Sequence, residues 1–129
     1  MKEIEISIKI RHYQLEELPE EERELVNTAI KATDNAYAAY PSGLCAERTA
    51  IFAAQANHPD KHITCLAIAA RNDNGLLKSP ITPCGACRQV IVGVEDRYKK
   101  PIKIMLYGTD GVYCLESARD LMPLSFIDD

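Results

Sequence analysis

Three cysteines in two distant motifs constrain the fold of this chain more than any other feature. Cys45 and Glu47 follow a Pro-Ser-Gly turn signal and precede an apolar helical run over residues 50–54. Further along, the run Pro-Cys-Gly-Ala-Cys at residues 83–87 opens a second apolar helical run. Each motif therefore places its cysteines in the first turn of a predicted helix. If the cysteines act jointly, the fold must bring the starts of these two helices together.

The residue types in these motifs indicate a metal site. Cys84 and Cys87 are three positions apart on a helix, so they share one face and can bind one ion. A helix N-terminus favours negative charge, which stabilises thiolates and a carboxylate such as that of Glu47. Three thiolates on Zn²⁺ leave one tetrahedral position open, as in catalytic zinc sites. A closed structural site would need a fourth ligand, for which the candidates without paired spacing are Cys65, Cys114, His58 and His62.

The order Cys-x-Glu and then Pro-Cys-x-x-Cys matches the zinc deaminase signature, with Cys45 in the place of its histidine. Residues 45–50 and 83–90 resemble the small homotetrameric, zinc-dependent cytidine deaminases of nucleoside salvage, and residues 121–126 are similar to the C-terminal segment of that family. The resemblance extends from about residue 29 to residue 126. It implies hydrolysis of a cyclic amidine C–N bond: free cytidine or deoxycytidine becomes uridine or deoxyuridine, and ammonia is released.

The resemblance also implies roles around the metal. Cys45, Cys84 and Cys87 would bind one zinc ion per chain, and Glu47 would carry protons between water, the base and the leaving ammonia. Arg48 and Arg88 are adjacent to these ligands and could donate hydrogen bonds to the sulfur atoms. For Arg88, an ordinary surface or intersubunit ion pair is the alternative.

Substrate contacts implied by the resemblance come from backbone and from aromatic side chains. The N–H of Ala46 would meet the base carbonyl, and the carbonyl of Thr82 would accept from the 4-amino group. Phe126, reaching from another subunit, would stack on the base. Tyr37 and Tyr40 would line pockets across subunit boundaries. The implied assembly is a homotetramer with active sites shared between subunits.

One stretch departs from the family pattern. Residues up to Ala38 look like the end of the family's first helix, and residues from Ala39 look like the lead-in to the zinc motif. Between these points the family carries roughly two dozen further residues, including those that hold the ribose. We interpret the difference as a segment missing from the sequence between Ala38 and Ala39. If the segment is truly absent, a non-catalytic zinc-binding module becomes the alternative.

Another alternative is a deaminase of a different small heterocycle, such as the blasticidin-type relatives that share both zinc motifs. Residues 48–50 and the Ser-Phe pair at 125–126 favour cytidine.

Composition favours a small-molecule substrate. The formal net charge is −4 and the isoelectric point is near 5.4, whereas a protein that grips DNA or RNA is expected to present a basic face. We find no signal sequence and no apolar run of membrane-spanning length, and we expect the five cysteines to be reduced in the cytoplasm. The expected partners are therefore a nucleoside and water, without nucleic acid or membrane.

Hydrophobic periodicity predicts one α/β domain over residues 1–129. Alternating isoleucines predict a strand over residues 2–12, which would pair at a sheet edge within the subunit or with another subunit. Cys65 and Cys114 are expected in core strands. The resemblance implies a three-layer α/β/α fold with a mixed, roughly five-stranded sheet. The other predicted elements are strands over 62–70, 102–107 and 112–114 and helices from about 19 to 36, 44 to 56, 85 to 94 and 117 to 121.

Overall fold

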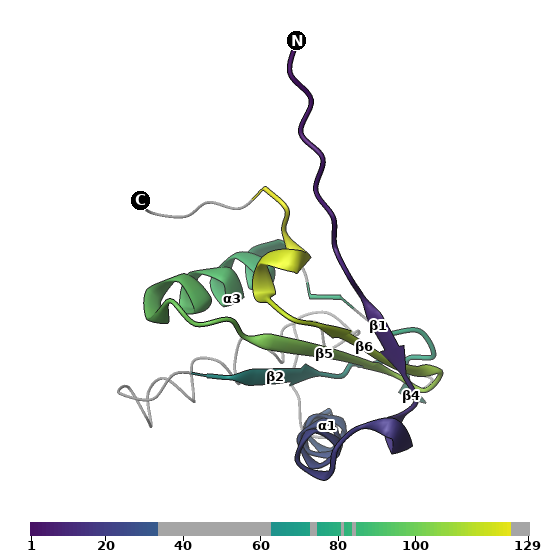
Figure 1. Cartoon of the computed structure of the whole chain (residues 1–129). Helices are drawn as coiled ribbons and strands as arrows, with labels where there is room; N and C mark the ends of the chain where they lie inside the picture. Colours follow the sequence, from purple (N-terminus) through teal and green to yellow (C-terminus); the bar gives the residue numbers. More distant parts are fainter. Residues whose placement is uncertain (34–62, 73–74, 81, 84, 125–129) are drawn as a thin grey trace.

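The computed structural model describes residues 1–33, 63–72, 75–80, 82–83 and 85–124. Within these residues, helices cover both faces of a mixed β-sheet (Figure 1). In chain order, the elements are β1 (Arg11–Tyr13), the 3-10 helix η1 (Leu15–Glu17), α1 (Glu20–Ala32), β2 (Cys65–Ile68), β3 (Arg71–Asn72), β4 (Gly75–Leu76), α3 (Gly85–Tyr98), β5 (Lys103–Gly108), β6 (Gly111–Leu115) and the 3-10 helix η2 (Ala118–Leu121).

The main sheet has the strand order β1-β6-β5-β2, and β3 and β4 form a separate antiparallel pair. β2 and β5 are parallel, with Cys65 opposite Lys103, whereas β6 is antiparallel to both β5 and β1. A parallel pair needs a crossover connection, and α3 lies within the one that joins β2 to β5. This arrangement confirms the predicted mixed α/β class, with four strands in the main sheet of the described residues.

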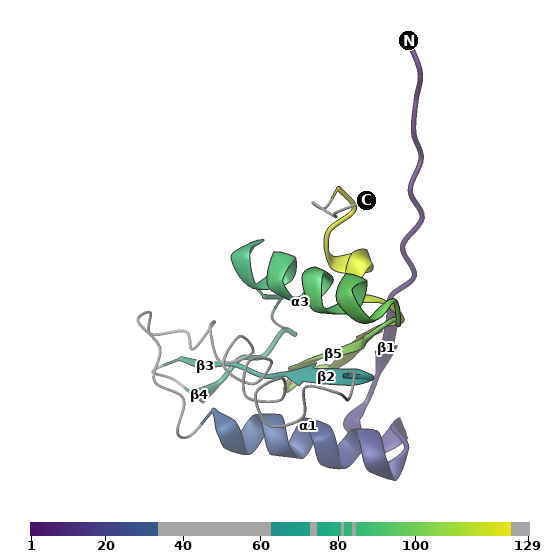
Figure 2. The same ribbon diagram turned by 90° about the vertical axis from the view of Figure 1, so that its left-hand side faces the viewer.

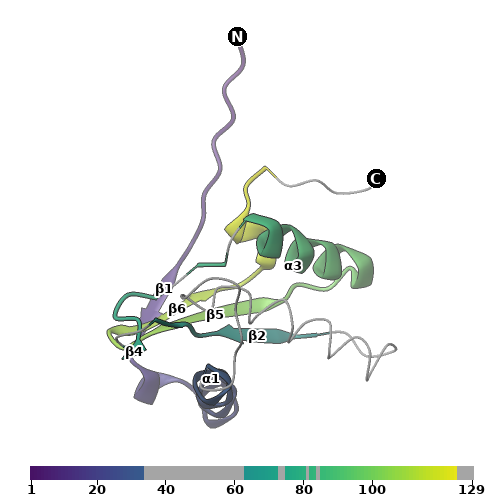
Figure 3. The same cartoon turned by 180° about the vertical axis from the view of Figure 1, so that it is seen from behind.

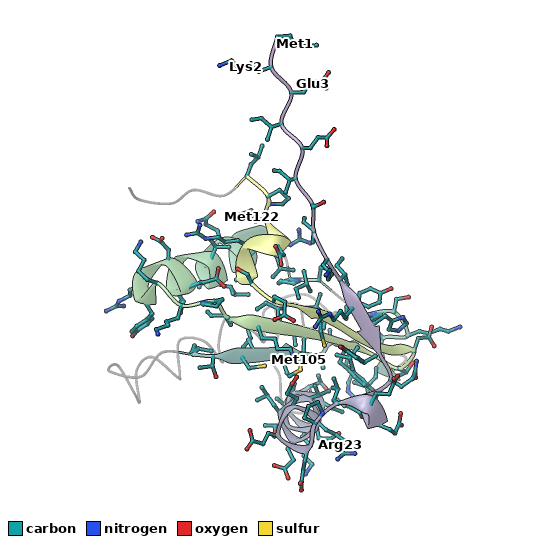
Figure 4. The ribbon with its side chains drawn as sticks, in the orientation of Figure 1. Met1, Lys2, Glu3, Arg23, Met105 and Met122 are labelled. Carbon is teal, nitrogen blue, oxygen red and sulfur yellow. The ribbon has the colours of Figure 1, made fainter. Side chains whose placement is uncertain are left out.

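The helices form the two outer layers. α1 lies on one face of the sheet, and α3 with η2 lies on the other, as Figures 1 and 2 show. Because successive strand residues point to opposite faces, Ile104 and Leu106 pack in the cluster beneath α3. Met105, labelled in Figure 4, packs with Val26 of α1 in the second cluster. The sheet is therefore the middle layer, and each of its two faces has its own apolar core beneath a helix.

α3 is longer than predicted. It runs to Tyr98, four residues beyond the predicted end near residue 94. The apolar pattern stops at Glu95, which nevertheless occupies a core position with 5% of its surface exposed. Its carboxylate is satisfied by hydrogen bonds, so the helix continues through a polar residue that the periodicity counts as an end. Lys99, with a φ of 53°, then takes the left-handed conformation that commonly ends helices.

The strand predicted over residues 2–12 is wrong over most of its length. Only Arg11–Tyr13 form β1, and residues 1–10, which we call the arm, leave the sheet as an extended, exposed segment. The register of β1 explains this, because Arg11 lies opposite Cys114 and β6 ends at Leu115. The chain beyond β6 turns into η2, so the sheet offers the arm no strand within the described residues.

β2, β5, β6 and α1 agree with the predictions to within a few residues, whereas η1, β3 and β4 were not predicted. The last predicted helix is the 3-10 helix η2, capped as expected by the side chain of Ser117, which accepts from the N–H of Arg119. The predicted helix over 44–56 lies outside the described residues. Among the described residues, no helix has both the length and the apolar character needed to cross a membrane.

Candidate active site

The second cysteine motif lies at the start of α3, as predicted. α3 begins at Gly85, and the side chain of Cys87 in its first turn is fully buried. The end of α3 at Tyr98 leads within a few residues into the start of β5. The start of α3 therefore lies toward the carboxyl ends of the parallel strands (Figure 1), which is where α/β proteins usually bind their ligands.

The segment that leads into this motif is fixed on the β5–β6 turn. The N–H groups of Thr109 and Asp110 donate to the carbonyls of Leu77 and Lys78, each at 3.0 Å. Gly108 permits this approach, because a Cβ at that position would lie 2.5 Å from the carbonyl oxygen of Lys78. Any larger residue would push the segment away. Two backbone hydrogen bonds therefore hold the segment before the motif against the β5–β6 turn.

Arg88 connects Pro83, the first residue of the motif, to the end of η2. Its Nε donates to the carbonyl of Pro83 at 2.8 Å, and its Nη1 donates to the carbonyl of Leu121 at 2.9 Å. Pro83 is itself buried. The guanidinium of Arg88 therefore links Pro83, which precedes α3, to η2, more than 30 residues further along the chain. The predicted contact of Arg88 with a ligand sulfur stays a prediction, because Cys84 lies outside the described residues.

Glu95 holds α3 in place from its other end. Its carboxylate accepts from the N–H of Ile102 at 2.7 Å, the N–H of Ala118 at 2.8 Å and the hydroxyl of Ser117 at 2.6 Å. These charge-assisted hydrogen bonds tie α3 to the segment before β5 and to the start of η2. Sequence reasoning missed this residue. Its signal was the spacing of Cys87, Ile91 and Glu95, four apart on one buried helix face.

Cys65 and Cys114 lie on the opposite side of the sheet from α3, in contact with the cluster beneath α1. Burial, aided by the charge of Glu22, raises the pKa of the Cys65 thiol to about 11. Burial likewise raises the pKa of Cys114. Both thiols are therefore protonated at neutral pH; Cys114 is a core residue as predicted, whereas Cys65 is half-buried at the edge of that core, and the sheet separates both from Cys87. Neither can complete a zinc site around α3.

The remaining predicted site residues are divided between described and undescribed parts of the chain. Thr82 is exposed, directly before the buried Pro83. The described residues contain no group of three His, Cys, Asp or Glu side chains that could hold a metal, as expected when two of three predicted ligands lie elsewhere. The predicted residues outside the described ranges are Tyr37, Tyr40, Cys45, Ala46, Glu47, Arg48, Cys84 and Phe126, together with His58 and His62.

The described part of the donor set fits zinc. Cys87 offers a fully buried sulfur in the first turn of α3, whereas Cys84, its predicted co-ligand, lies outside the described residues. Sulfur is a preferred donor for Zn²⁺, and a helix start favours its thiolate form. The described residues therefore contribute one sulfur, at a helix start, to the predicted zinc site.

Comparison with known families agrees with this chemistry. Residues 23–100 match the family model of the cytidine and deoxycytidylate deaminase zinc-binding region. The match covers more than half of the chain and includes both cysteine motifs. The chain belongs to this family. It is accordingly a zinc-binding deaminase with Zn²⁺ as its cofactor, a hydrolase that acts on a C–N bond of cytidine-like substrates.

Proposed function

We propose that the protein is a cytidine deaminase of pyrimidine salvage, which hydrolyses free cytidine or deoxycytidine to uridine or deoxyuridine and ammonia. The observation that carries this proposal is the fully buried Cys87 in the first turn of α3, inside the matched zinc-binding region. Cys45, Cys84 and Cys87 would hold one zinc ion per chain. When bound, zinc supplies Lewis acidity that brings the pKa of a coordinated water toward neutrality.

Glu47 is the proposed acid–base residue. Its carboxylate would accept a proton from the attacking water and deliver it to N3 of the base, and it would then help protonate the departing ammonia. Glu47 lies two positions beyond Cys45, so the same predicted helix start would hold ligand and proton carrier. Arg48, next to Glu47, would donate to a ligand sulfur and offset part of the charge of three thiolates.

The backbone beside the two motifs would orient the base. The carbonyl of Thr82 would accept from the 4-amino group, while the N–H of Ala46 would donate to the base carbonyl. The structure supports the first assignment, because Pro83 restricts Thr82 to extended conformations and Arg88 holds the carbonyl of Pro83. Tyr37 and Tyr40 are proposed to line the pocket.

We propose a cytoplasmic homotetramer in which Phe126 of one subunit stacks on the base held by another. The segment after η2 supports this arrangement. Leu121 is fixed to α3 through Arg88, whereas Leu124 is 87% exposed. An apolar side chain gains free energy if a neighbouring subunit covers it. The net charge of −4 supports a free nucleoside over a polynucleotide substrate.

The proposal is tested by the absorbance change on deamination, measured with the zinc-loaded product of the full gene. Cytidine, deoxycytidine, cytosine and blasticidin S are compared at equal concentrations, with Glu47→Gln as the inactive control. We expect turnover of cytidine or deoxycytidine and little of the other two. Preferred turnover of blasticidin S would instead establish the other heterocycle deaminase, and stoichiometric zinc without any turnover would establish a non-catalytic module.

A further inference from the structure

The arm, residues 1–10, has the sequence of a strand but no strand partner within the described residues. It leaves the sheet on the side of α3 and extends away from the rest of the molecule (Figures 1 and 3). Its side chains alternate from one side to the other, as Figure 4 shows. The exposed fractions of Ile4, Ile6, Ile8 and Ile10 are 83%, 52%, 38% and 54%. Four isoleucines on one side of an extended segment form an apolar stripe that calls for a covering partner.

Within the described residues, the main sheet offers no strand that could pair with the length of the arm. Continuing the β1 register would place Ile10 opposite Leu115, where β6 ends. The other edge of the sheet is β2, which lies beyond β6 and β5. The arm therefore continues an edge strand past the end of its neighbour, with backbone N–H and C=O groups open to another extended chain.

The arm is complementary to itself when two copies run antiparallel. In the register centred on Ser7, Ile4 faces the partner's Ile10, and Ile6 faces the partner's Ile8. On the other side, Glu3 faces the partner's Arg11, and Glu5 faces the partner's Lys9. The two-fold axis of the ribbon generates each of these pairs twice. All four isoleucines and both glutamates thus meet a matching side chain in a single register.

Neighbouring registers match less well. Shifting by one residue places three of the four isoleucines opposite charged residues and the fourth opposite Ser7, because the side chains of a strand alternate between its faces. A shift that pairs Ile6 with itself leaves Lys2 opposite Ile10 and Glu5 opposite Ser7. The register centred on Ser7 is therefore the one favoured by both apolar contact and charge.

We propose that the arm pairs with the arm of a second copy of this chain as an antiparallel ribbon about a two-fold axis at Ser7. The isoleucines of this ribbon lie on the strand face of His12, whose ring meets the Tyr113 ring edge-on at 5.0 Å. Tyr113 in turn packs against the cluster beneath α3. The apolar side of the ribbon thus continues the apolar side of each sheet. A two-fold contact of this kind joins chains in pairs and uses none of the proposed site residues.

Disulfide formation in the full-length, zinc-loaded protein tests the contact. In the proposed register, Ser7 faces the partner's Ser7, and residues directly opposite in antiparallel strands have Cα atoms about 4.5–5.5 Å apart, within disulfide range. Ser7→Cys should therefore form a cross-linked dimer with oxidised glutathione on a non-reducing gel. Glu5→Cys is the matched control, because its two copies would be about 13 Å apart along the strands. We expect cross-linking at least about tenfold slower for the control.

Charge reversal in the Ser7→Cys background tests the register. Glu5→Lys alone places two lysines opposite each other twice per ribbon, and Lys9→Glu alone does the same with glutamates. Each should slow cross-linking at least about threefold at low salt. The double variant, Glu5→Lys with Lys9→Glu, restores opposite charges and should return the rate to that of Ser7→Cys.

Equal cross-linking of Ser7→Cys and Glu5→Cys would overturn the proposal, as would absence of the Ser7→Cys dimer in a protein that light scattering shows to be oligomeric. Failure of the double variant to recover would overturn the register. These results are independent of the proposed deaminase activity, which is measured separately with cytidine and should be retained by Ser7→Cys. They are also independent of the shared-site tetramer, because deleting residues 124–129 should leave the arm cross-link intact.

Discussion

Cys87 and Cys65 show how position decides what a cysteine does in this protein. Cys87 is buried where a helix begins, beside a second cysteine in the sequence, whereas Cys65 is half-buried in a strand on the other side of the sheet. A helix start stabilises a thiolate of the kind that binds a metal, whereas the apolar surroundings of Cys65 favour a neutral thiol. The motif spacing predicts a metal-binding role for Cys87, which stays a prediction, and the apolar run around residue 65 predicted that Cys65 lies in a strand.

Cys87→Ala should release zinc and lower stability together. The sulfur is fully buried, so its removal leaves a small cavity at the start of α3 as well as an incomplete ligand set. We expect less than one tenth of parental zinc by elemental analysis and a lower thermal midpoint. Cys114→Ala, on the α1 side, is the control: it should lose some stability but keep its zinc. Full zinc occupancy in Cys87→Ala would refute the ligand assignment.

Glu47→Gln should separate chemistry from metal binding. Loss of a general acid–base group typically lowers turnover by about 10²–10⁴-fold. Because Glu47 is not a proposed ligand, zinc content should remain at the parental level. Steady-state kinetics with cytidine and elemental analysis measure the two quantities in one preparation. Activity within tenfold of the parent would contradict the assigned role.

Cys65 should be slow to alkylate. Its thiol pKa of about 11, against an ordinary value of 9.0, lowers the thiolate fraction by about 100-fold at neutral pH. Iodoacetamide labelling followed by peptide mass spectrometry should show this difference between native and denatured protein. The folded state holds the proton more tightly than the unfolded state. The contribution of Cys65 to stability is therefore constant below pH 9 and falls as the pH rises from 9 toward 11.

At the scale of elements, the predictions were most accurate where each element repeats a simple pattern. The apolar runs gave β2, β5 and β6 and the start of α3, because buried strands and helix openings are marked by local residue types. The predicted end of α3 was wrong because the pattern treats Glu95 as a polar end of the helix. Glu95 is buried instead, since distant groups such as the N–H of Ala118 donate hydrogen bonds to its carboxylate. The apolar pattern also predicted a full strand for the arm, because periodicity identifies an apolar face but not the length of the neighbouring strand.

Glu95→Ala should destabilise the protein by about 3 kcal/mol, because it leaves the buried N–H groups of Ile102 and Ala118 without an acceptor. Chemical denaturation measures this difference. Glu116→Ala is the control, since that side chain is 61% exposed and its ion pair with Arg11 is long at 3.5 Å. A change below about 0.5 kcal/mol is expected for it. Equal effects of the two substitutions would show that Glu95 does not fix α3.

At the scale of the whole molecule, the resemblance to the deaminase family implied the three-layer α/β/α order but not how its parts are joined. The layers follow from elements with one apolar face each, which bury that face against a shared sheet. The elements are held together by single contacts between distant residues. Examples are the hydrogen bond from Arg88 to the carbonyl of Leu121 and the close approach of Lys78 to Gly108. Such contacts have no local periodicity, and only the folded chain reveals them.

Deleting residues 124–129 tests the shared active site. If Phe126 completes the pocket of a neighbouring subunit, the truncated protein should retain zinc but lose cytidine turnover. Light scattering before and after truncation reports the mass of the assembly. A matched variant, Leu124→Ser, keeps Phe126 but removes the exposed apolar side chain that a neighbouring subunit would cover, and it should lose less turnover than the truncated protein. A fully active monomer at assay concentration would contradict the shared-site proposal.

The double donation of Arg88 has a consequence for how the protein would be handled in the laboratory. The same guanidinium holds the carbonyl of Pro83, at the start of the cysteine motif, and the carbonyl of Leu121, at the end of η2. We therefore expect that loosening of the first contact also loosens the second. Limited proteolysis after residue 121 should therefore report whether zinc is bound. We expect the protein treated with a chelator to be cleaved there faster than the zinc-loaded protein. The Arg88→Ala variant should be cleaved at the same rate with and without zinc.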